Sequence, residues 1–287
     1  MSARFPLALS LSRRLRRHCG VALLLPALAG PAAAQDEVPF ITTPDAVTLA
    51  MLQLAGVGPQ DRLVDLGSGD GRIVITAARR FGARGLGVEI VPELVARSRD
   101  NARAAGVADR AEFREQDLFT LDLAAYSVIT MYLLPQVNLQ LRERLLALAP
   151  GTRIVSHDWD LGDWKPDRSV VVDAPDKPIG RDKTSTVHLW VVPARLAGWW
   201  CGDGVGLHVR QHYQQVSVTM LRRGQAAPAW VFDGRATAGG LQDGDAQTAP
   251  SIVAGLSAEG LRITRAAGVA AIGFEGALLR QSASTCF

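Results

Sequence analysis

The stretch LVDLGSGDGRIVITAARRFGARGLGVEI, residues 63–90, decides the fold. It opens on an apolar run that ends in an acid, continues through a glycine-rich turn, and leads into the amphipathic segment GRIVITAARRFG. A second apolar run, GLGVEI, then ends in another acid. This order predicts a buried strand, a tight turn, a helix that stops at Gly82, and a second strand.

The same alternation of strand-like runs and helical patterns extends from about residue 40 to 194. It predicts an α/β fold, a Rossmann-like parallel sheet with helices on both faces and right-handed crossovers. Two runs near the end, RSVVVDA and TVHLWVVP, follow each other without a helix, and we expect them to pair antiparallel. Upstream, Thr43 is the expected N-cap of a helix with Pro44 at its first position, lying across the mouth of the sheet.

After Pro193 the pattern changes. Residues 195–287 show short alternating runs, many glycines and little helical periodicity. These features predict a small antiparallel β domain, a barrel or a sandwich, whose role the sequence leaves open.

The first 34 residues have the pattern of a signal peptide. A basic stretch, SRRLRRH, precedes the apolar run CGVALLLPALAG, and an Ala-x-Ala site ends at Ala34. The apolar run is short and contains Pro26, so we expect no stable membrane span. The leader predicts a periplasmic or secreted protein, and a start site assigned too far upstream would make the protein cytoplasmic.

Charge and cysteine content narrow the class further. The formal net charge is only +3, and the basic leader carries several of the positive charges. We therefore expect no nucleic-acid partner, because non-specific binding needs a dense Lys/Arg surface. Beyond the leader two cysteines remain, Cys201 and Cys286, which in an exported chain suggest one disulfide worth about 4 kcal/mol. Two unrelated buried thiols are the alternative.

The glycines of the turn favour a nucleotide-like ligand. Gly67 and Gly69 permit positive φ and a close approach of the backbone. Free N–H groups of the turn, with the helix dipole behind them, would favour an anionic group. The glycines at 67, 69 and 71 do not satisfy G-x-G-x-x-G, and no P-loop is present.

Three acids, Asp65, Glu89 and Asp117, each follow a successive apolar run. In a parallel sheet these positions meet at the carboxyl edge, next to the point where the strand order reverses. Each acid also has a structural alternative: a loop cap at Asp65, a solvated strand end at Glu89, and a helix N-cap at Asp117.

The run VDLGSGDGR resembles the first motif of class I S-adenosylmethionine (SAM) methyltransferases. The resemblance implies that Asp65 meets the ammonium of SAM, that Glu89 accepts from the ribose hydroxyls, and that Asp117 accepts from the adenine amino group. The cofactor-binding residues that it implies are Asp65, Gly67, Ser68, Gly69, Gly71, Glu89, Asp117 and Leu118.

A closer resemblance covers roughly residues 38–194. The segments TPDAVTLAMLQLAGV, DLGSGDGRIVITAA, MYLLP and GDWKPD are similar to one narrow family of small lysine methyltransferases. That family includes the mitochondrial enzymes acting on the ATP synthase c-subunit and on the adenine nucleotide translocase. The resemblance implies SAM as cofactor and a protein substrate presenting a lysine, and it does not extend to residues 195–287.

In the expected reaction the main task of the protein is to align the reactants, because SAM brings the methyl group and the protein orients a nucleophile behind it. A lysine must first lose its proton, at a cost of about 4–5 kcal/mol at pH 7, lowered by an apolar channel near the sulfonium. We expect Tyr132 to orient the amine. Further catalytic candidates are Asn138, His157 and Asp158, and Thr42 and Thr43 are candidates to close over the ligand. Helix capping, for Asn138 and the threonines, and ordinary loop polarity are the alternatives, and no metal site is expected.

Two further functions stay open at this point. SAM is made in the cytoplasm, whereas the leader predicts export. An exported binding or structural module with an idle methyltransferase fold, docking a partner on its β domain, is therefore one alternative. A methyltransferase acting on a small molecule is the other.

Overall fold

The computed structural model describes residues 40–202, 204–225, 227–243, 251–267, 276–281 and 286. The predicted leader, residues 1–34, lies outside the described residues. Among the helices of the described part, none combines the length and the apolar character needed to cross a membrane.

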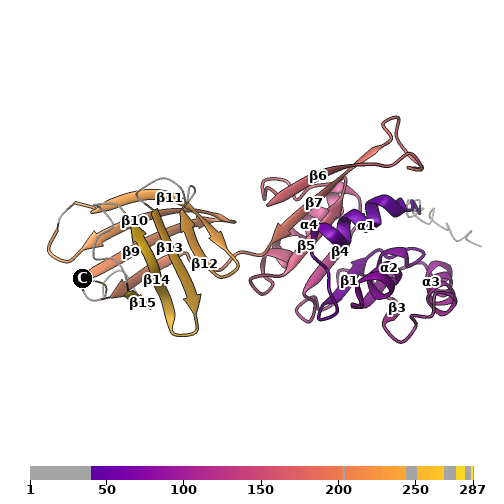
Figure 1. Cartoon of the computed structure of the whole chain (residues 1–287), viewed down its shortest axis with the longest axis horizontal. Helices are drawn as coiled ribbons and strands as arrows, with labels where there is room; N and C mark the ends of the chain where they lie inside the picture. The colour runs from indigo at the N-terminus through magenta and orange to yellow at the C-terminus, as the bar shows by residue number, and fades with distance from the viewer. Residues whose placement is uncertain are drawn as a thin grey trace, which may run out of the picture. The chain divides into compact units, whose positions relative to one another are not determined.

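A seven-stranded sheet forms the first part of the described chain (Figure 1). Its strands are β1 (Arg62–Leu66), β2 (Arg84–Glu89), β3 (Ala111–Glu115), β4 (Val128–Met131), β5 (Arg153–His157), β6 (Arg168–Asp173) and β7 (Thr184–Val191). Their order is β3-β2-β1-β4-β5-β7-β6. Strands β1 to β5 run parallel, and β7 is antiparallel to both β5 and β6. The predicted α/β class and the antiparallel pair are confirmed.

Helices cover both faces of this sheet, as predicted. They are α1 (Asp45–Leu54), α2 (Arg72–Phe81), α3 (Pro92–Ala104) and α4 (Pro135–Leu146). Buried residues of α1, α2 and α3 belong to one core cluster, and those of α4 belong to a second. Successive residues of β1, Leu63 and Val64, lie in different clusters, because strand side chains alternate between faces.

Helix α2 begins and ends at glycines in the left-handed conformation. Gly71 precedes it at φ 83° and Gly82 follows it at φ 71°, which confirms the predicted glycine stop. Helix α1 differs from its prediction. It starts at Asp45, Pro44 stands at the N-cap position, and no side chain caps it. The N-cap prediction for Thr43 is therefore wrong, and its hydroxyl is hydrogen-bonded to His157 across the sheet edge.

The C-terminal strands close into an eight-stranded antiparallel barrel. They are β8 (Gly198–Gly202), β9 (Val205–His212), β10 (Gln215–Arg222), β11 (Trp230–Thr237), β12 (Gly240–Asp243), β13 (Ser251–Ser257), β14 (Gly260–Ala267) and β15 (Gly276–Gln281). Apolar side chains such as Trp200, Val218, Met220 and Leu261 are buried together in its core. Of the two predicted architectures, the barrel is correct, and its interior is packed with side chains.

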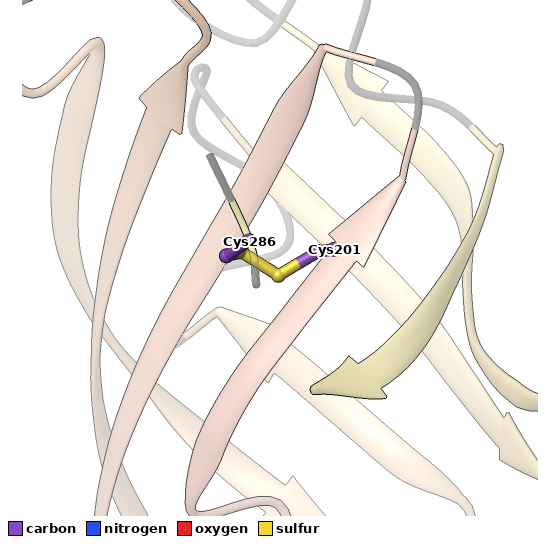
Figure 2. Close-up of a disulfide and its surroundings, with 2 residues drawn as sticks. All are labelled: Cys201 and Cys286. Carbon is purple, nitrogen blue, oxygen red and sulfur yellow. A yellow bond between two sulfur atoms is a disulfide. The ribbon is translucent and has the colours of Figure 1, made fainter. Parts of the chain in front are cut away.

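A disulfide joins Cys201 of β8 to Cys286 near the C-terminus, with the Cα atoms 5.5 Å apart (Figure 2). The bond agrees with the pairing suggested by the even cysteine count. It spans 85 residues, a loop whose closure is worth about 4–5 kcal/mol in the chain-entropy model. The covalent link therefore stabilises the β domain in particular.

Candidate active site

Asp65 lies buried on β1 at the centre of the sheet, with 2% of its surface exposed. The hydroxyl of Thr130, on the adjacent strand β4, donates to its carboxylate over 2.7 Å. Burial raises the pKa of Asp65 to about 8; the Thr130 hydrogen bond opposes the shift, and the nearby charges of Asp70 and Glu89 add to it. At neutral pH this carboxyl is mostly protonated, so a cation placed beside it would favour its ionisation.

Three glycines shape the turn after β1, with φ values of 74° at Gly67, 53° at Gly69 and 83° at Gly71. Their N–H groups are already used. Those of Gly67 and Ser68 donate to the Val88 carbonyl at 2.9 Å, that of Gly69 donates to Glu89, and that of Gly71 donates to the Ser68 carbonyl. The expected set of free N–H groups for an anion is therefore wrong for these four residues.

The glycines instead allow the backbone of the turn to pack closely against neighbouring side chains. A Cβ at Gly67 would lie 2.9 Å from the Leu133 side chain, and a Cβ at Gly69 would collide with the ring of Phe40. The hydroxyl of Ser68 is buried without a partner among the described residues. A Cβ on Gly87 of β2 would meet this hydroxyl at 2.6 Å, so Ser68 packs against the sheet.

Glu89 ends β2 and is held in one orientation by three backbone donors. Its carboxylate accepts from the N–H groups of Gly69 at 3.0 Å, Ile90 at 2.8 Å and Val91 at 3.1 Å. The side chain is half-buried. A solvated strand end would not be held in this way. Oε1 accepts from Ile90 and Val91, and Oε2 accepts only from Gly69, so Oε2 keeps a lone pair to accept from a hydroxyl group.

Asp117 lies two residues beyond the end of β3, in an exposed turn. Its carboxylate accepts from the Phe119 N–H at 2.8 Å, which is local turn bonding. The helix N-cap alternative is wrong, since a turn rather than a helix follows. Leu118 is half-buried against the second core cluster. The role of Asp117 toward adenine stays a prediction.

These residues fit SAM by the chemistry of their side chains. Asp65 offers a carboxyl that an ammonium would ionise, and Glu89 offers a fixed acceptor for hydroxyls. The left-handed glycines let the side chains of Leu133, Phe40 and Phe113 pack directly on the turn, where a Cβ would collide with them. Because the acceptors for the ammonium and for the ribose lie on adjacent strands β1 and β2, the expected cofactor position is consistent with the fold.

Tyr132 and His157 form the next part of the same edge, after β4 and at the end of β5. Their rings stack with centroids 3.9 Å apart and planes at 29°. His157 is fully buried; its Nδ1 lies 3.2 Å from the Thr43 hydroxyl and its Nε2 lies 2.8 Å from that of Ser185. Burial lowers the pKa of His157 to about 4, although Asp158 opposes the shift. Burial, with the charge of Asp158, raises the pKa of Tyr132. Both rings are therefore neutral at pH 7.

Asp158 follows β5 in the left-handed conformation, with φ 61°. Its Oδ1 accepts from the Thr186 N–H at 2.9 Å, and its Oδ2 lies 2.7 Å from the Nζ of Lys177. The same Oδ2 is 3.4 Å from the Nε2 of His157. The sequence did not single out Lys177, which reaches this carboxylate from the loop between β6 and β7.

Asn138 does not lie at the N-cap position that the sequence suggested. Helix α4 starts at Pro135, so Asn138 lies within its first turn and is completely buried. Its Nδ2 donates to the Ser156 hydroxyl and to the Trp159 carbonyl, both at 3.1 Å. The N-cap alternative is therefore wrong, and Asn138 holds the loop that carries Asp158.

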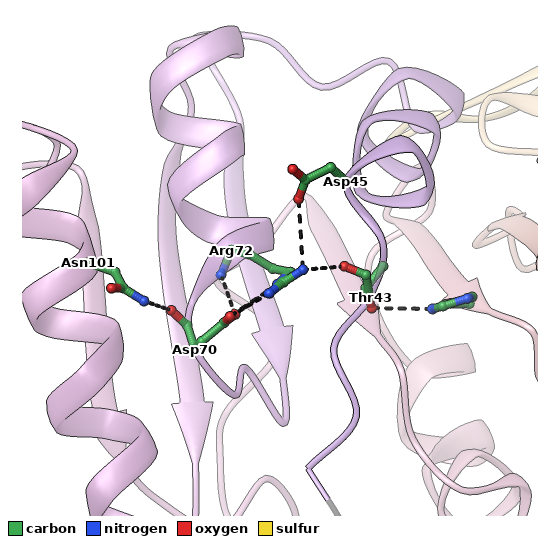
Figure 3. A network of polar contacts seen from close by, with 6 residues as sticks. Thr43, Asp45, Asp70, Arg72 and Asn101 are labelled. Atoms are coloured by element: carbon green, nitrogen blue, oxygen red, sulfur yellow. Dashed lines mark hydrogen bonds and ion pairs between the residues drawn. The ribbon is translucent and has the colours of Figure 1, made fainter. Parts of the chain in front are cut away.

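A polar network that sequence reasoning missed ties the segment before α1 to the glycine turn (Figure 3). The guanidinium of Arg72 binds the Asp70 carboxylate, with the shortest contact at 2.7 Å, and donates to the Thr43 carbonyl at 2.8 Å. Asn101 donates to the Asp70 carbonyl at 2.9 Å, and Asp45 lies 3.8 Å from Arg72. The adjacent acid and arginine in GDGR were the available signal.

The segment leading into α1 covers part of the site. Phe40 is 42% exposed, and its ring lies against Gly69. Thr42 is half-buried, and Thr43 is buried against His157. The expectation that this segment closes over a ligand stays a prediction, and Phe40 joins its candidate residues.

Comparison with known proteins identifies the family. A family model described as the ANTKMT methyltransferase domain matches residues 65–168. A protein-lysine N-methyltransferase of Saccharolobus islandicus is 38% identical over 158 residues, covering 54% of this chain and 94% of that protein. The chain therefore belongs to this family of SAM-dependent methyltransferases, as the sequence predicts.

Other similar proteins have names that specify other substrates. The mouse lysine N-methyltransferase of the ATP synthase c-subunit is 42% identical over 108 residues, 37% of this chain and 43% of that protein. The mouse adenine nucleotide translocase lysine N-methyltransferase is 38% identical, over 38% of this chain and 48% of that protein. The chain thus matches about half the length of these two relatives. A solved structure of an RNA methyltransferase from Salinibacter ruber with S-adenosylhomocysteine is 51% identical over 54% of this chain and 96% of that one, with TM-score 0.49.

Proposed function

We propose that this protein transfers a methyl group from SAM to the side-chain amine of a lysine in a protein substrate. One observation carries the proposal. The carboxyl edge of one sheet holds Asp65 and Glu89 on β1 and β2, and a lysine ammonium is already bound to Asp158 after β5. The names of the lysine methyltransferases above support the same acceptor.

On the cofactor side, SAM supplies the electrophilic methyl group when it is bound. Asp65 pairs with its ammonium, and the fixed carboxylate of Glu89 accepts from its ribose hydroxyls. Asp117 accepts from the adenine amino group after giving up its hydrogen bond to Phe119, and Leu118 packs beside the ring. Phe40 and the threonines that follow it exclude water from the glycine turn.

On the acceptor side, the neutral Tyr132–His157 stack provides a wall along which the lysine side chain lies. The amine must reach the sulfur-bound methyl in its neutral form, and in water this deprotonation costs about 4–5 kcal/mol at pH 7. Burial against the neutral wall and the positive sulfonium lower that cost, the Asp158 carboxylate opposes them by favouring the ammonium, and the proton passes to solvent. The Tyr132 hydroxyl and the carbonyls of the MYLLP segment orient the amine lone pair for in-line transfer. Asn138 and His157 act by positioning Asp158 and Tyr132.

Calorimetric titration tests the cofactor half of the proposal. The purified chain is titrated with SAM and with S-adenosylhomocysteine, beside Glu89→Ala and a matched control, Glu112→Ala, on the exposed face of β3. We expect micromolar binding that Glu89→Ala loses and Glu112→Ala keeps. A folded protein that binds neither ligand would contradict the proposal.

Acceptor identity needs a second experiment. Labelled SAM is supplied with lysine-rich peptides, with the same peptides carrying arginine in place of lysine, and with short RNAs. Label in the lysine peptides alone is the expected result. Label in RNA, or in small amines with the peptides inert, would replace protein lysine by another acceptor.

The cellular location and domain organisation are part of the proposal. We infer that residues 1–34 direct export, that residues 38–194 form the methyltransferase domain, and that residues 195–287 dock a partner. The disulfide supports an oxidising compartment, because such bonds persist there. The same observation favours, as a second candidate, an exported binding module without turnover. Cell fractionation with and without residues 1–34 decides the location, and the labelling assay decides turnover.

A further inference from the structure

The chain contains only three lysines, at positions 165, 177 and 183, although it has many arginines. Two of them are exposed and bind only backbone carbonyls in the contacts described: Lys165 to Gly162 and Lys183 to Lys177. Lys177 differs, since its side chain is 14% exposed and its ammonium lies 2.7 Å from the Asp158 carboxylate. A long cationic side chain is thus held at the sheet edge that carries the candidate site.

The Asp158 carboxylate is arranged to hold a cation on one oxygen. The Thr186 N–H fixes Oδ1, which leaves Oδ2 for the ammonium. The backbone at Asp158 is left-handed, a strained conformation for a non-glycine residue that occurs preferentially at functional sites. The buried amide of Asn138 binds the next carbonyl along, that of Trp159, so the loop cannot relax freely.

The bound ammonium lies close to the aromatic wall. The Oδ2 of Asp158 that holds it is 3.4 Å from the Nε2 of His157, and the His157 ring stacks on Tyr132. The charge of Lys177 itself contributes to lowering the pKa of His157, and that of Asp158 to raising the pKa of Tyr132. An alkylammonium on Asp158 is therefore a neighbour of the residues expected to orient the acceptor.

We propose that the Asp158 carboxylate is the subsite for the acceptor's ammonium and that Lys177 fills it, as an internal substitute, until an acceptor lysine displaces it. The inference rests on the proposed function, and it identifies the part of the substrate that binds Asp158 as a primary alkylammonium. Exchange of one ammonium for another keeps the half-buried carboxylate paired throughout, which avoids the penalty of leaving it alone. Lys177 also gives up its hydrogen bond to the Thr184 carbonyl on leaving.

Binding of n-butylammonium to the cofactor-free chain tests the subsite without any turnover. Ligand-observed NMR titration compares the wild type, Lys177→Met and the matched control Lys165→Met, whose exposed lysine contacts only the Gly162 carbonyl in the contacts described. An internal competitor that fills the site most of the time weakens the apparent affinity in proportion. We therefore expect Lys177→Met to bind butylammonium about tenfold more tightly than the wild type, with Lys165→Met unchanged.

The double variant Lys177→Met/Asp158→Asn tests whether the gain depends on the carboxylate. Asparagine tolerates the left-handed conformation and keeps an acceptor for the Thr186 N–H, so the loop should fold, as circular dichroism would verify. The gain should vanish in this variant. A gain that persists, or equal binding by Lys177→Met and the wild type, would overturn the inference. A lower melting temperature of Lys177→Met without tighter binding would mark the ion pair as structural only.

Titration of each variant with SAM separates this inference from the proposed function. If SAM binding and peptide labelling are normal but Lys177→Met gains no affinity for butylammonium, the proposed subsite is wrong and the proposed function stands. A gain in butylammonium binding, with no lysine peptide ever labelled, defeats the proposed function and leaves the cation site. If both hold, Lys177→Met lowers KM for the peptide and leaves kcat close to that of the wild type.

Discussion

The ring of Tyr132 lies on the ring of His157, with their centroids 3.9 Å apart, so that β4 and β5 present one aromatic wall at the carboxyl edge of the sheet. His157 is held in turn by the hydroxyls of Thr43 and Ser185. The position of the Tyr132 ring is therefore set by contact with a histidine that is itself buried and neutral.

Tyr132→Phe tests what the hydroxyl contributes beyond the stack. Phenylalanine keeps the aromatic contact, so we expect melting to change little and kcat to fall by about 10- to 100-fold, a loss of about 1.4–2.7 kcal/mol. Tyr132→Ala loses the contact as well and should also melt earlier. Steady-state kinetics with thermal melts separates the two effects, and an unchanged kcat in Tyr132→Phe would remove the hydroxyl from the reaction.

Acid should destabilise the protein through His157. Its pKa is about 4 in the folded chain and near 6.5 when unfolded, so between these values the unfolded state binds more protons. Stability from this residue is complete above pH 6.5 and is lost as pH falls toward 4, to the extent of about 3 kcal/mol. Denaturant titrations at pH 4 to 7 should show this slope in the wild type and a shallower one in His157→Gln. Parallel slopes would contradict the assignment.

Cofactor binding should release a proton from Asp65. The free carboxyl has a pKa of about 8 and is mostly protonated at pH 7, and an adjacent ammonium favours its ionised form. We expect about one proton released per cofactor bound and an affinity that rises with pH toward 8. Calorimetry in two buffers of different ionisation enthalpy measures the release. Asp65→Asn, the control, should bind weakly and release none.

Arg72→Ala should loosen the segment before α1 from the glycine turn. The arginine bridges Asp70 and the Thr43 carbonyl, and we expect SAM affinity to fall about tenfold, or 1.4 kcal/mol. Arg72→Lys keeps the charge but not the two-pronged contact, so it should rescue only part of the loss. Arg79→Ala, exposed on the same helix, serves as the control. Equal affinities in all three variants would show that the network does not position the site.

Removal of the disulfide should affect the β domain alone. Cys201→Ser/Cys286→Ser is expected to lower the stability of the barrel by about 3–5 kcal/mol, because the 85-residue loop is no longer closed. SAM affinity should be unchanged. Two-stage melting followed with and without reductant measures the first effect, and calorimetry the second. Loss of SAM binding in the reduced protein would link the two domains energetically.

Local patterns in the sequence were sufficient for the α/β order, the glycine stop at Gly82 and the acids that follow successive strands. They were sufficient because strand and helix periodicity and the positive φ of glycine are properties of short segments. Parallel strands then necessarily bring Asp65 and Glu89 to one edge. The even cysteine count likewise pointed to the bond between Cys201 and Cys286.

Only the tertiary structure decided what the polar side chains bind. Thr43 and Asn138 were expected to cap helices, but Pro44 and Pro135 place the helix starts elsewhere. Their side chains instead meet His157, 114 residues away, and the loop after β5. The contact of Lys177 with Asp158 also depends on how β6 and β7 return to the sheet edge. A polar group takes its partner from whatever the packed fold places within about 3 Å, and that distance is not encoded in any local run of residues.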